Sequence, residues 1–257
     1  MQEEKNIDAA AAGFYDSVAA DYDAMTGFER RFVLERPFFR LLVEQNAIKS
    51  ALDAGCGTGF HSLLLSQLGV AVTAVDVSPE MVRRTLQHAE QAGVQLKALQ
   101  SSFAQVRNAV DSNFDAVFSL GNSVAHLLNP NDIFDALAGF ASVLAPNGTL
   151  FVQLLNYDRI LLKRERIQNV KQVQQTMFVR FYDYENDLVR FNILKLDKKG
   201  DDVEHHLLSI PLRPIRSTEI ASLLRQAGFA QVSIYGGISL EKYSPETSKD
   251  IFVVARR

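Results

Sequence analysis

The spacing of apolar and polar positions divides the chain into a helical start, an alternating middle and a late β-rich segment. Over residues 8–46 apolar side chains recur every three or four positions, which predicts amphipathic helices. Pro37 lies inside this stretch, so we expect a kink or a break between two helices there. From residue 50 onward, short apolar runs alternate with helical segments.

The alternating part predicts a doubly wound α/β fold. Strands are expected at residues 50–53, 70–76, 95–100, 114–120 and 148–155, with helices at 60–68, 80–91 and 132–144. This order predicts a mostly parallel sheet with right-handed crossovers. A helix at 217–226 and strands at 231–235 and 249–255 restore the alternation near the C-terminus.

Between these two parts the rhythm changes, which predicts an insertion. Three β-rich runs, 176–184, 188–196 and 203–212, are joined by turn-like polar segments. We therefore expect an N-terminal helical cap (1–47), an α/β core (48–159 and 213–257) and an inserted antiparallel β lid over the substrate (160–212).

Composition narrows the classes of partner. The chain has 257 residues, is 47% hydrophobic and carries a net charge of −3, without a Lys/Arg block that would follow nucleic acid. Its single cysteine excludes an internal disulfide. A secretory signal pattern and an apolar run of ~20 residues for a membrane span are both missing. We expect a soluble cytoplasmic protein with no nucleic-acid or membrane partner; the oligomeric state stays open, with a homodimer as one option.

A glycine loop follows the first expected strand. Asp53 precedes Gly55, Gly57 and Gly59, and glycines allow positive φ and close approach of a ligand. The spacing is GxGxG rather than the GxGxxG of dinucleotide sites, and Asp53 would repel a phosphate but attract an ammonium. Asp76 closes the second strand, where a carboxylate can accept both hydroxyls of a ribose. These groups predict a ligand with a ribose and a cationic amino acid tail; the alternative is a tight turn and a simple helix cap.

Three segments resemble the class I S-adenosylmethionine (SAM)-dependent methyltransferases: LDAGCGTG at 52–59, VDVSPEM at 75–81 and FDAVFSLGN at 114–122. The resemblance implies a seven-stranded sheet whose last strand runs antiparallel between its neighbours, with SAM as cofactor. It implies that Gly55 and Gly57 lie at the methionine portion and Asp76 at the ribose. The other cofactor contacts expected are Asp53, Cys56 (as a small residue without a redox role), Val77, Met81, Ser102, Phe103 and Leu120.

Two further segments, LGNSVAHL at 120–127 and LNYDRIL at 155–161, are similar to the glycine/sarcosine N-methyltransferase group, as is EKYSP at 241–245. This similarity implies that Asn156 aims the acceptor nitrogen and that Tyr243 lines the substrate pocket. It also places Arg31 at the SAM carboxylate. Asn122 and His126 are expected to shape the pocket wall, and Tyr22 to cover the cofactor. Asn156 could instead belong to an ordinary turn.

The inserted segment shows no match to that group, so the residue that binds a substrate carboxylate must be chosen by type. Arg180 and Arg190 lie on expected strands and are candidates, although such side chains are often only solvated. His205 and His206 alternate sides of a strand without further ligands, so no metal site is expected.

The sequence thus predicts a SAM-dependent methyltransferase of a small molecule, with an amine such as a glycine-like amino acid as the sharpest hypothesis. O- or C-methylation of a small metabolite is the alternative, in which His126 would act as the base. A non-catalytic SAM-binding protein is a further alternative. An NAD-dependent oxidoreductase is disfavoured, because Asp53 would face its pyrophosphate.

Overall fold

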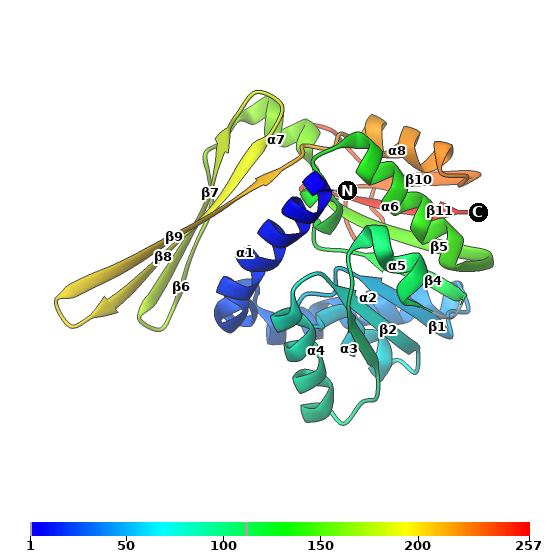
Figure 1. Cartoon of the computed structure of the whole chain (residues 1–257), viewed down its shortest axis with the longest axis horizontal. Coiled ribbons are helices and arrows are strands. Elements are labelled where there is room, and N and C mark those ends of the chain that lie inside the picture. Colours follow the sequence, from blue (N-terminus) through cyan, green and yellow to red (C-terminus); the bar gives the residue numbers. More distant parts are fainter. Residues whose placement is uncertain (1, 111–112) are drawn as a thin grey trace.

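In the computed structural model a seven-stranded sheet forms the centre of the molecule (Figure 1). The structure describes residues 2–110 and 113–257, with side chains from residue 7 onward. In spatial order the strands are β10 (Gln231–Tyr235), β11 (Asp250–Arg256), β5 (Leu144–Leu155), β4 (Phe114–Ser119), β1 (Ser50–Ala54), β2 (Ala71–Asp76) and β3 (Lys97–Gln100). Strand β11 pairs antiparallel with both β10 and β5, whereas the other pairs of this sheet are parallel. The predicted fold class is confirmed.

Alternate residues of the central strands enter two different apolar clusters, because successive strand side chains point to opposite faces. Leu52 and Val117 pack into one cluster with α6 (Pro130–Val143) and α8 (Ser217–Gln226). Phe118 packs on the other face with α2 (Phe28–Gln45) and α3 (Phe60–Gln67). The remaining helices of the core are α4 (Pro79–Gln91), α5 (Val106–Ala109), η1 (Phe103–Gln105) and η2 (Ser123–His126).

The N-terminal helices are α1 (Gln2–Thr26) and α2. They are separated at Gly27, whose φ of 78° is left-handed and suits glycine. Of the kink or break predicted at Pro37, the break is wrong, because α2 continues through Pro37. A proline's fixed φ is close to the helical value, so the cost at this position is one lost backbone hydrogen bond and local crowding, which α2 accommodates.

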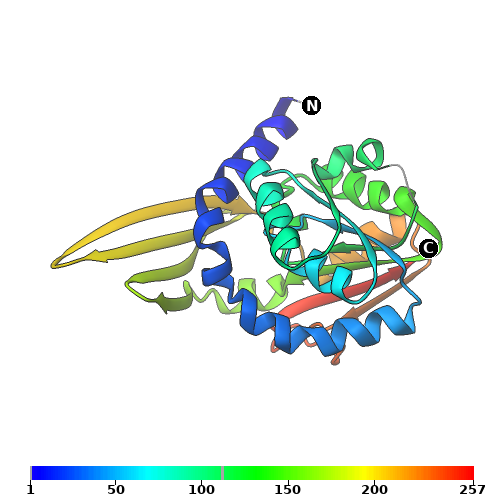
Figure 2. The same ribbon diagram turned by 90° about the horizontal axis from the view of Figure 1, so that it is seen from below.

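A second sheet follows α7 (Tyr157–Lys163) and is wholly antiparallel. Its strands are β6 (Ile167–Val173), β7 (Thr176–Tyr184), β8 (Val189–Lys199) and β9 (Asp202–Leu212). We call these four strands the inserted sheet. The last three were predicted, whereas β6 was not, because its polar sequence IQNVKQV resembles a loop. The long hairpin of β8 and β9 extends away from the core (Figure 2).

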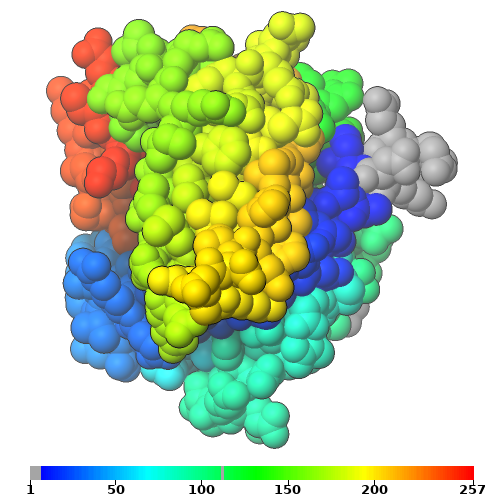
Figure 3. All heavy atoms as spheres, turned by 90° about the vertical axis from the view of Figure 1, so that its left-hand side faces the viewer, coloured from blue at the N-terminus to red at the C-terminus, as the bar shows by residue number. Residues whose placement is uncertain are grey.

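Helix α1 lies between the core and the inserted sheet (Figures 1 and 2). Its Phe14, Val18 and Met25 pack with Phe178 and Ile193 of the inserted sheet. Seen from its outer side, the inserted sheet covers the middle of this face, with part of α1 visible beside it (Figure 3). Helix α1 therefore faces the α/β core on one side and the inserted sheet on the other.

No helix in the described ranges is both long enough and apolar enough to cross a membrane.

Candidate active site

The glycine loop between β1 and α3 is fixed by its own backbone. Gly55 has a φ of 78°, and a Cβ there would lie 2.7 Å from Ser123 Oγ, so no larger residue fits without a shift. Gly55 N–H and Cys56 N–H both donate to the carbonyl of Val75, at 2.8 and 3.0 Å. Gly57 N–H donates to Asp76 Oδ2 at 2.9 Å. Donors that would bind a pyrophosphate are thus already used, which disfavours a phosphate ligand.

Asp76 lies at the end of β2 and lines the cavity above this loop. Its side chain is almost buried and accepts N–H groups from Gly57 and Ser78, each at 2.9 Å. Burial raises the pKa of Asp76 to about 6, while these backbone donors act in the opposite direction. At neutral pH the carboxylate is ionised and suits a ligand that donates hydroxyl groups.

Asp53 has a different position from the one predicted. Its side chain is 1% exposed, does not line the cavity and accepts the Ser62 hydroxyl of α3 at 2.6 Å. Burial raises the pKa of this carboxyl. Because β1 is central and α3 begins directly over its end, Asp53 points beneath the loop. The predicted contact between Asp53 and the ammonium of a ligand is therefore wrong, because Asp53 lies beneath the loop.

The other predicted cofactor residues, with one exception, gather around one space, which we call the inner cavity. Met81 is the exception: it is fully buried and packs against Ala11 and Phe14 of α1. The predicted residues that line the inner cavity are Tyr22, Arg31, Gly55, Cys56, Gly57, Asp76, Val77, Ser102, Phe103 and Leu120. Sequence reasoning missed Thr58, His61, Ser101 and Ser123, although Ser101 and Ser123 adjoin residues that it had selected.

Arg31 reaches the inner cavity from the first turn of α2. Its Nε and Nη2 donate to the carboxylate of Glu35 at 2.7 and 3.3 Å. The guanidinium carbon lies 4.2 Å from the centre of the Phe60 ring. The charge of Arg31 is therefore held at the cavity by an ion pair and an aromatic face, in a position compatible with a cofactor carboxylate.

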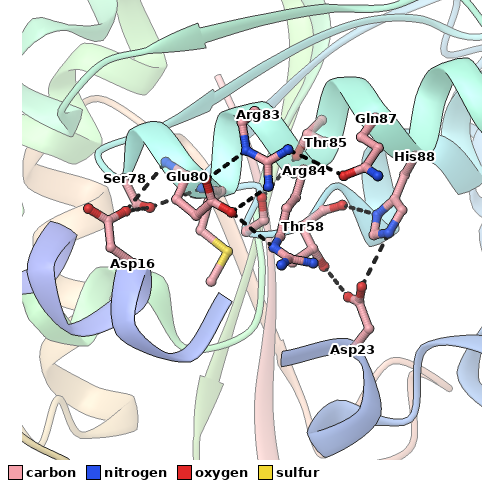
Figure 4. A network of polar contacts seen from close by, with 12 residues as sticks. Asp16, Asp23, Thr58, Ser78, Glu80, Arg83, Arg84, Thr85, Gln87 and His88 are labelled. Carbon is pink, nitrogen blue, oxygen red and sulfur yellow. Dashed lines mark hydrogen bonds and ion pairs between the residues drawn. The ribbon is translucent and has the colours of Figure 1, made fainter. Parts of the chain in front are cut away.

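Helix α1 is attached to the cofactor side of the core by two aspartates (Figure 4). Asp16 accepts the Ser78 hydroxyl at 2.5 Å, at the start of α4. Asp23 accepts the Thr58 hydroxyl of the glycine loop at 2.6 Å and lies 3.2 Å from His88 Nε2. The two aspartates are two helical turns apart and so share one face of α1. This face fixes α1 as the roof of the inner cavity.

Tyr15 and His126 stand where the inner cavity meets a second space. Tyr15 Oη and His126 Nε2 form a hydrogen bond of 2.8 Å, whereas His126 Nδ1 is buried without a partner. Burial lowers the pKa of His126 to about 4, so the imidazole is neutral at pH 7. Both side chains line both spaces.

The second space, which we call the outer cavity, lies between α1, the end of β5 and the inserted sheet. Tyr22, Arg31 and Gly121 also line both cavities, so the two cavities adjoin. Side chains that line only the outer cavity include Phe14, Val18, Met25, Asn122, Gln153, Arg159, Arg180, Tyr182, Phe191, Ile193 and Asp250. A molecule in the outer cavity would thus lie directly beside one in the inner cavity.

Two cationic side chains of the outer cavity have unmet hydrogen-bonding capacity. The Nε atoms of Arg159 and Arg180 are buried and have no partner. By contrast, Lys195 of the inserted sheet is paired with Asp21 at 2.7 Å. Arg190, the other candidate from the sequence, pairs with Glu185 at 2.5 Å and does not line the cavity. Of the two predicted arginines, only Arg180 lies at the site.

Asn156 and Tyr243 were predicted to contact the substrate. In the structure they support the loop before β11 instead. The Asn156 amide is fully buried and donates to three carbonyls of residues 244–248, at 2.9 to 3.2 Å. Its Oδ1 accepts the Tyr243 hydroxyl at 2.9 Å. Neither residue lines the inner cavity or the space between α1, the end of β5 and the inserted sheet. The loop folds over the end of β5, and its carbonyls need a buried donor, which Asn156 supplies.

Asn122 lines the outer cavity, but its amide is engaged within the protein. It donates to the Tyr157 hydroxyl at 2.9 Å and accepts the Leu155 N–H at 3.0 Å. Asn122, predicted as a substrate-binding residue, therefore lies in the wall of the outer cavity with its amide engaged within the protein.

The comparisons with known proteins agree with this geometry. Residues 51–148 match the model of a methyltransferase domain. A glycine/sarcosine N-methyltransferase from Aphanothece halophytica is 31% identical over 224 residues, which cover 87% of this chain and 82% of the relative. The chain belongs to the class I SAM-dependent methyltransferases. A second glycine/sarcosine N-methyltransferase, from Parasynechococcus marenigrum, is 29% identical over 88% of this methyltransferase and 78% of the relative.

A solved structure of a SAM-dependent methyltransferase from Clostridium acetobutylicum has the same fold. It aligns with a TM-score of 0.79 at 16% identity, over 94% of this methyltransferase and 98% of that chain. Together these likenesses make this protein an enzyme that transfers a methyl group from SAM to a small molecule.

The residues of the inner cavity fit SAM. The buried Asp76 carboxylate suits the ribose hydroxyls, and the loop donors are committed internally, as a ligand without phosphates allows. Arg31 places a cation at the same cavity, as a ligand with a carboxylate requires. Among residues 7–110 and 113–257, the structure has no group of three or more His, Cys, Asp or Glu side chains that could hold a metal ion.

Proposed function

We propose that this methyltransferase N-methylates a small α-amino acid bound in the outer cavity. The observation that carries the proposal is the pair of buried, unpartnered Nε atoms of Arg159 and Arg180. A buried donor without an acceptor is costly, and a carboxylate is the acceptor that a guanidinium binds best. An acceptor molecule with a carboxylate would satisfy both groups.

The relatives support an amine as the methyl acceptor. Two relatives that align with most of this chain are named for activity on glycine and sarcosine, which both carry an amine and a carboxylate. The outer cavity offers both kinds of contact, because Asp250 lines it together with the two arginines. A zwitterionic acceptor would thus meet a charge of opposite sign at each end.

When bound, SAM supplies a methyl group on a positively charged sulfur, which leaves by in-line displacement. The protein's part is chiefly to orient the acceptor, which can contribute roughly 7–11 kcal/mol. Asp76 would hold the ribose of the cofactor and Arg31 its carboxylate, both from the inner cavity. Arg159 and Arg180 hold the acceptor carboxylate, so that its nitrogen faces the junction formed by Tyr15 and His126.

The acceptor nitrogen must lose a proton before it can attack, because an ammonium has no lone pair. The buried surroundings favour the neutral amine. Asp250 lines the outer cavity, so its carboxylate is placed to accept the released proton. From there the proton can pass to solvent.

O-methylation is less well supported by the surroundings of His126. A hydroxyl acceptor needs a base whose pKa is near the working pH. The pKa of His126 is lowered to about 4, and its Nε2 is already bound to Tyr15. His126 is better suited to shaping the wall beside the transferred methyl group.

Replacement of Arg180 tests the proposal. Arg180→Gln should raise the KM for an α-amino acid by about 10- to 150-fold, the value of one charged hydrogen bond, and should leave the Kd for SAM unchanged. Arg190→Gln is the matched control, because Arg190 lies on the same sheet but is paired with Glu185 outside the cavity.

A panel of acceptors completes the test. Labelled SAM is offered with α-amino acids, with the same amines lacking the carboxylate, and with phenols. The proposal expects label on the amino acids first. Preference for phenols, or an unchanged KM in Arg180→Gln, would contradict it.

A further inference from the structure

We infer that the face of the inserted sheet that points away from α1 is an interface between two copies of this chain. This interface is independent of the identity of the methyl acceptor. Successive strand residues point to opposite faces, so each strand of the sheet has one side toward α1 and one side away from it. The side toward α1 carries Phe178, Ile193 and Ile210, which pack with the helix. If the other side were only solvated, polar residues would be expected there.

The side that points away from α1 is apolar across the whole width of the sheet. Strand pairing aligns its side chains in one row, in the order Val170, Val179, Leu194 and Leu207. With their apolar neighbours on the same side they form what we call the exposed face: Ile167, Val170, Met177, Val179, Phe181, Leu194, Leu196 and Leu207. Val170 is 58% exposed, and Ile167 and Leu207 are each 56% exposed. Among the described residues, none of this set belongs to the apolar clusters of the molecule.

The exposed face lies at the front of the molecule in Figure 3, where no other segment of the described chain lies over it. Apolar side chains that are exposed singly are ordinary, but a contiguous apolar patch marks a site of interaction. A sheet that buries one face and leaves the other to solvent normally alternates apolar and polar residues. Here apolar residues occupy both faces, which is typical of a sheet that is covered on both sides.

The size of the exposed face agrees with that of a dimer interface. The four strands, at about 4.8 Å spacing, span roughly 19 Å, and the nine residues of β7 extend over roughly 30 Å. The face therefore presents roughly 570 Å² per copy, to which the relief of the side chains adds. Two copies together would bury more than about 1,100 Å², and specific interfaces begin at about 1,000–1,200 Å².

A second copy is the partner whose chemistry matches this surface. Apolar sheet faces pack against one another about 10 Å apart, and a two-fold axis brings the same surface of each copy together. Near the core, Arg166 pairs with Asp183 at 2.8 Å and Arg190 with Glu185 at 2.5 Å. Because these charges are balanced within each copy, two such rims can meet without strong repulsion. An apolar centre with a polar rim is the usual anatomy of an interface.

Sedimentation velocity tests the interface. The unmodified protein should be a dimer at about 10 μM, because well-packed interfaces reach a micromolar or lower Kd. Leu194→Glu, in the middle of the row, and Leu207→Glu, at its edge, should each raise the Kd of the dimer at least about a hundredfold, since a buried charge without a partner is costly. Leu207 lies on an edge strand and is already 56% exposed, so the fold of the monomer should tolerate this change.

Leu34→Glu is the matched control, because Leu34 is 63% exposed but lies on α2. It should leave the dimer intact. All three variants should bind SAM with the Kd of the unmodified protein, which calorimetry measures and which shows that they are folded. An unmodified protein that is still monomeric at about 100 μM, and so has a Kd above the micromolar range, would overturn this inference. A dimer that both Leu194→Glu and Leu207→Glu leave intact would overturn it as well.

Discussion

The inner and outer cavities of this methyltransferase adjoin, but they are built in different ways. The floor of the inner cavity is backbone: the loop of Gly55 and Gly57 is tied to Val75 and Asp76 within one β-α-β unit. The outer cavity is made of side chains from α1, β5, α7, the inserted sheet and β11. A site built from backbone depends on a short motif, whereas a site built from distant side chains can change with any of its elements.

This difference separates the binding of the cofactor from the choice of the acceptor within a single protein. The loop cannot accept a side chain at Gly55 without a clash at Ser123. The side chains around Arg180 come from several separate elements and are under no comparable backbone constraint. We therefore expect mutations of the inner cavity to affect cofactor binding and mutations of the outer cavity to affect the choice of acceptor.

The largest effect should follow from Asp76→Ala. Loss of two hydroxyl contacts to a carboxylate costs roughly 3–6 kcal/mol, so the Kd for SAM should rise at least a hundredfold by calorimetry. Asp115→Ala is a matched control: Asp115 accepts the N–H groups of Lys49 and Ser50 at the opposite edge of the sheet. It should lower the melting temperature and keep the Kd within about twofold. Equal losses of affinity in both variants would contradict the assignment of Asp76.

Asn156→Ala should affect the stability of the protein rather than either cavity, because Asn156 lies near the end of β5 but lines neither cavity. The change removes two amide N–H donors, which are shared among three loop carbonyls, and an oxygen that accepts from Arg159 N–H and the Tyr243 hydroxyl. The free energy of unfolding should fall by about 4 kcal/mol, at roughly 1 kcal/mol for each of these four groups. Tyr243→Phe should lower it by a smaller amount, since one hydroxyl is lost. Urea unfolding measures both variants. A stable Asn156→Ala protein with a large loss of turnover would restore the role first expected of Asn156.

The sequence was sufficient for the parts of the molecule that are locally encoded. The order of strands and helices, the glycine loop and Asp76 follow from patterns within a few dozen residues. Asp53 was misplaced because strand position does not tell whether a strand-end side chain points into a cleft or beneath a loop. Asn156 was misplaced because its partners lie about 90 residues later in the loop before β11.

The outer cavity was the least predictable part. Arg180 was chosen by residue type, but its difference from Arg190 depends on which face of the inserted sheet each side chain occupies. Arg159 and Asp250 were not selected, because their approach to one space depends on the pairing of β5 with β11. Strand β6 was missed for a related reason: its polar residues gain stability from pairing with β7 rather than from burial.

A smaller effect is expected from Gly55→Ala. A methyl group at φ 78° would lie within 2.8 Å of Ser123, so the loop must shift and the Kd for SAM should rise about tenfold. Gly69→Ala is matched, because Gly69 also has a positive φ of 86° but nothing lies within 4 Å of its added Cβ. The Gly69→Ala protein should be less stable than the unmodified protein but should have the same Kd for SAM. An equal rise in Kd for both would mean that backbone strain alone, and not the close approach, matters at Gly55.

The smallest effect expected is a dependence of SAM affinity on pH. The raised pKa of Asp76, about 6, means that the carboxyl becomes protonated as the pH falls through 6 and loses acceptor capacity for the ribose. The Kd should therefore be flat above pH 7 and should rise by up to about tenfold per unit below pH 6. Asp76→Asn has no such titration and should show a flat profile. A wild-type profile without a break between pH 5 and 7 would contradict the buried, ionised carboxylate.

The position of the transferred methyl group tests the central claim most directly. An amino acid offers SAM two acceptors, its nitrogen and its carboxylate, and the orientation by Arg159 and Arg180 predicts transfer to nitrogen only. Mass spectrometry of the product before and after mild alkali distinguishes the two, because alkali cleaves a methyl ester and leaves an N-methyl group intact. We predict an alkali-stable product of one added methyl group. A product that loses its methyl group in alkali would show that the carboxylate, and not the amine, faces the cofactor.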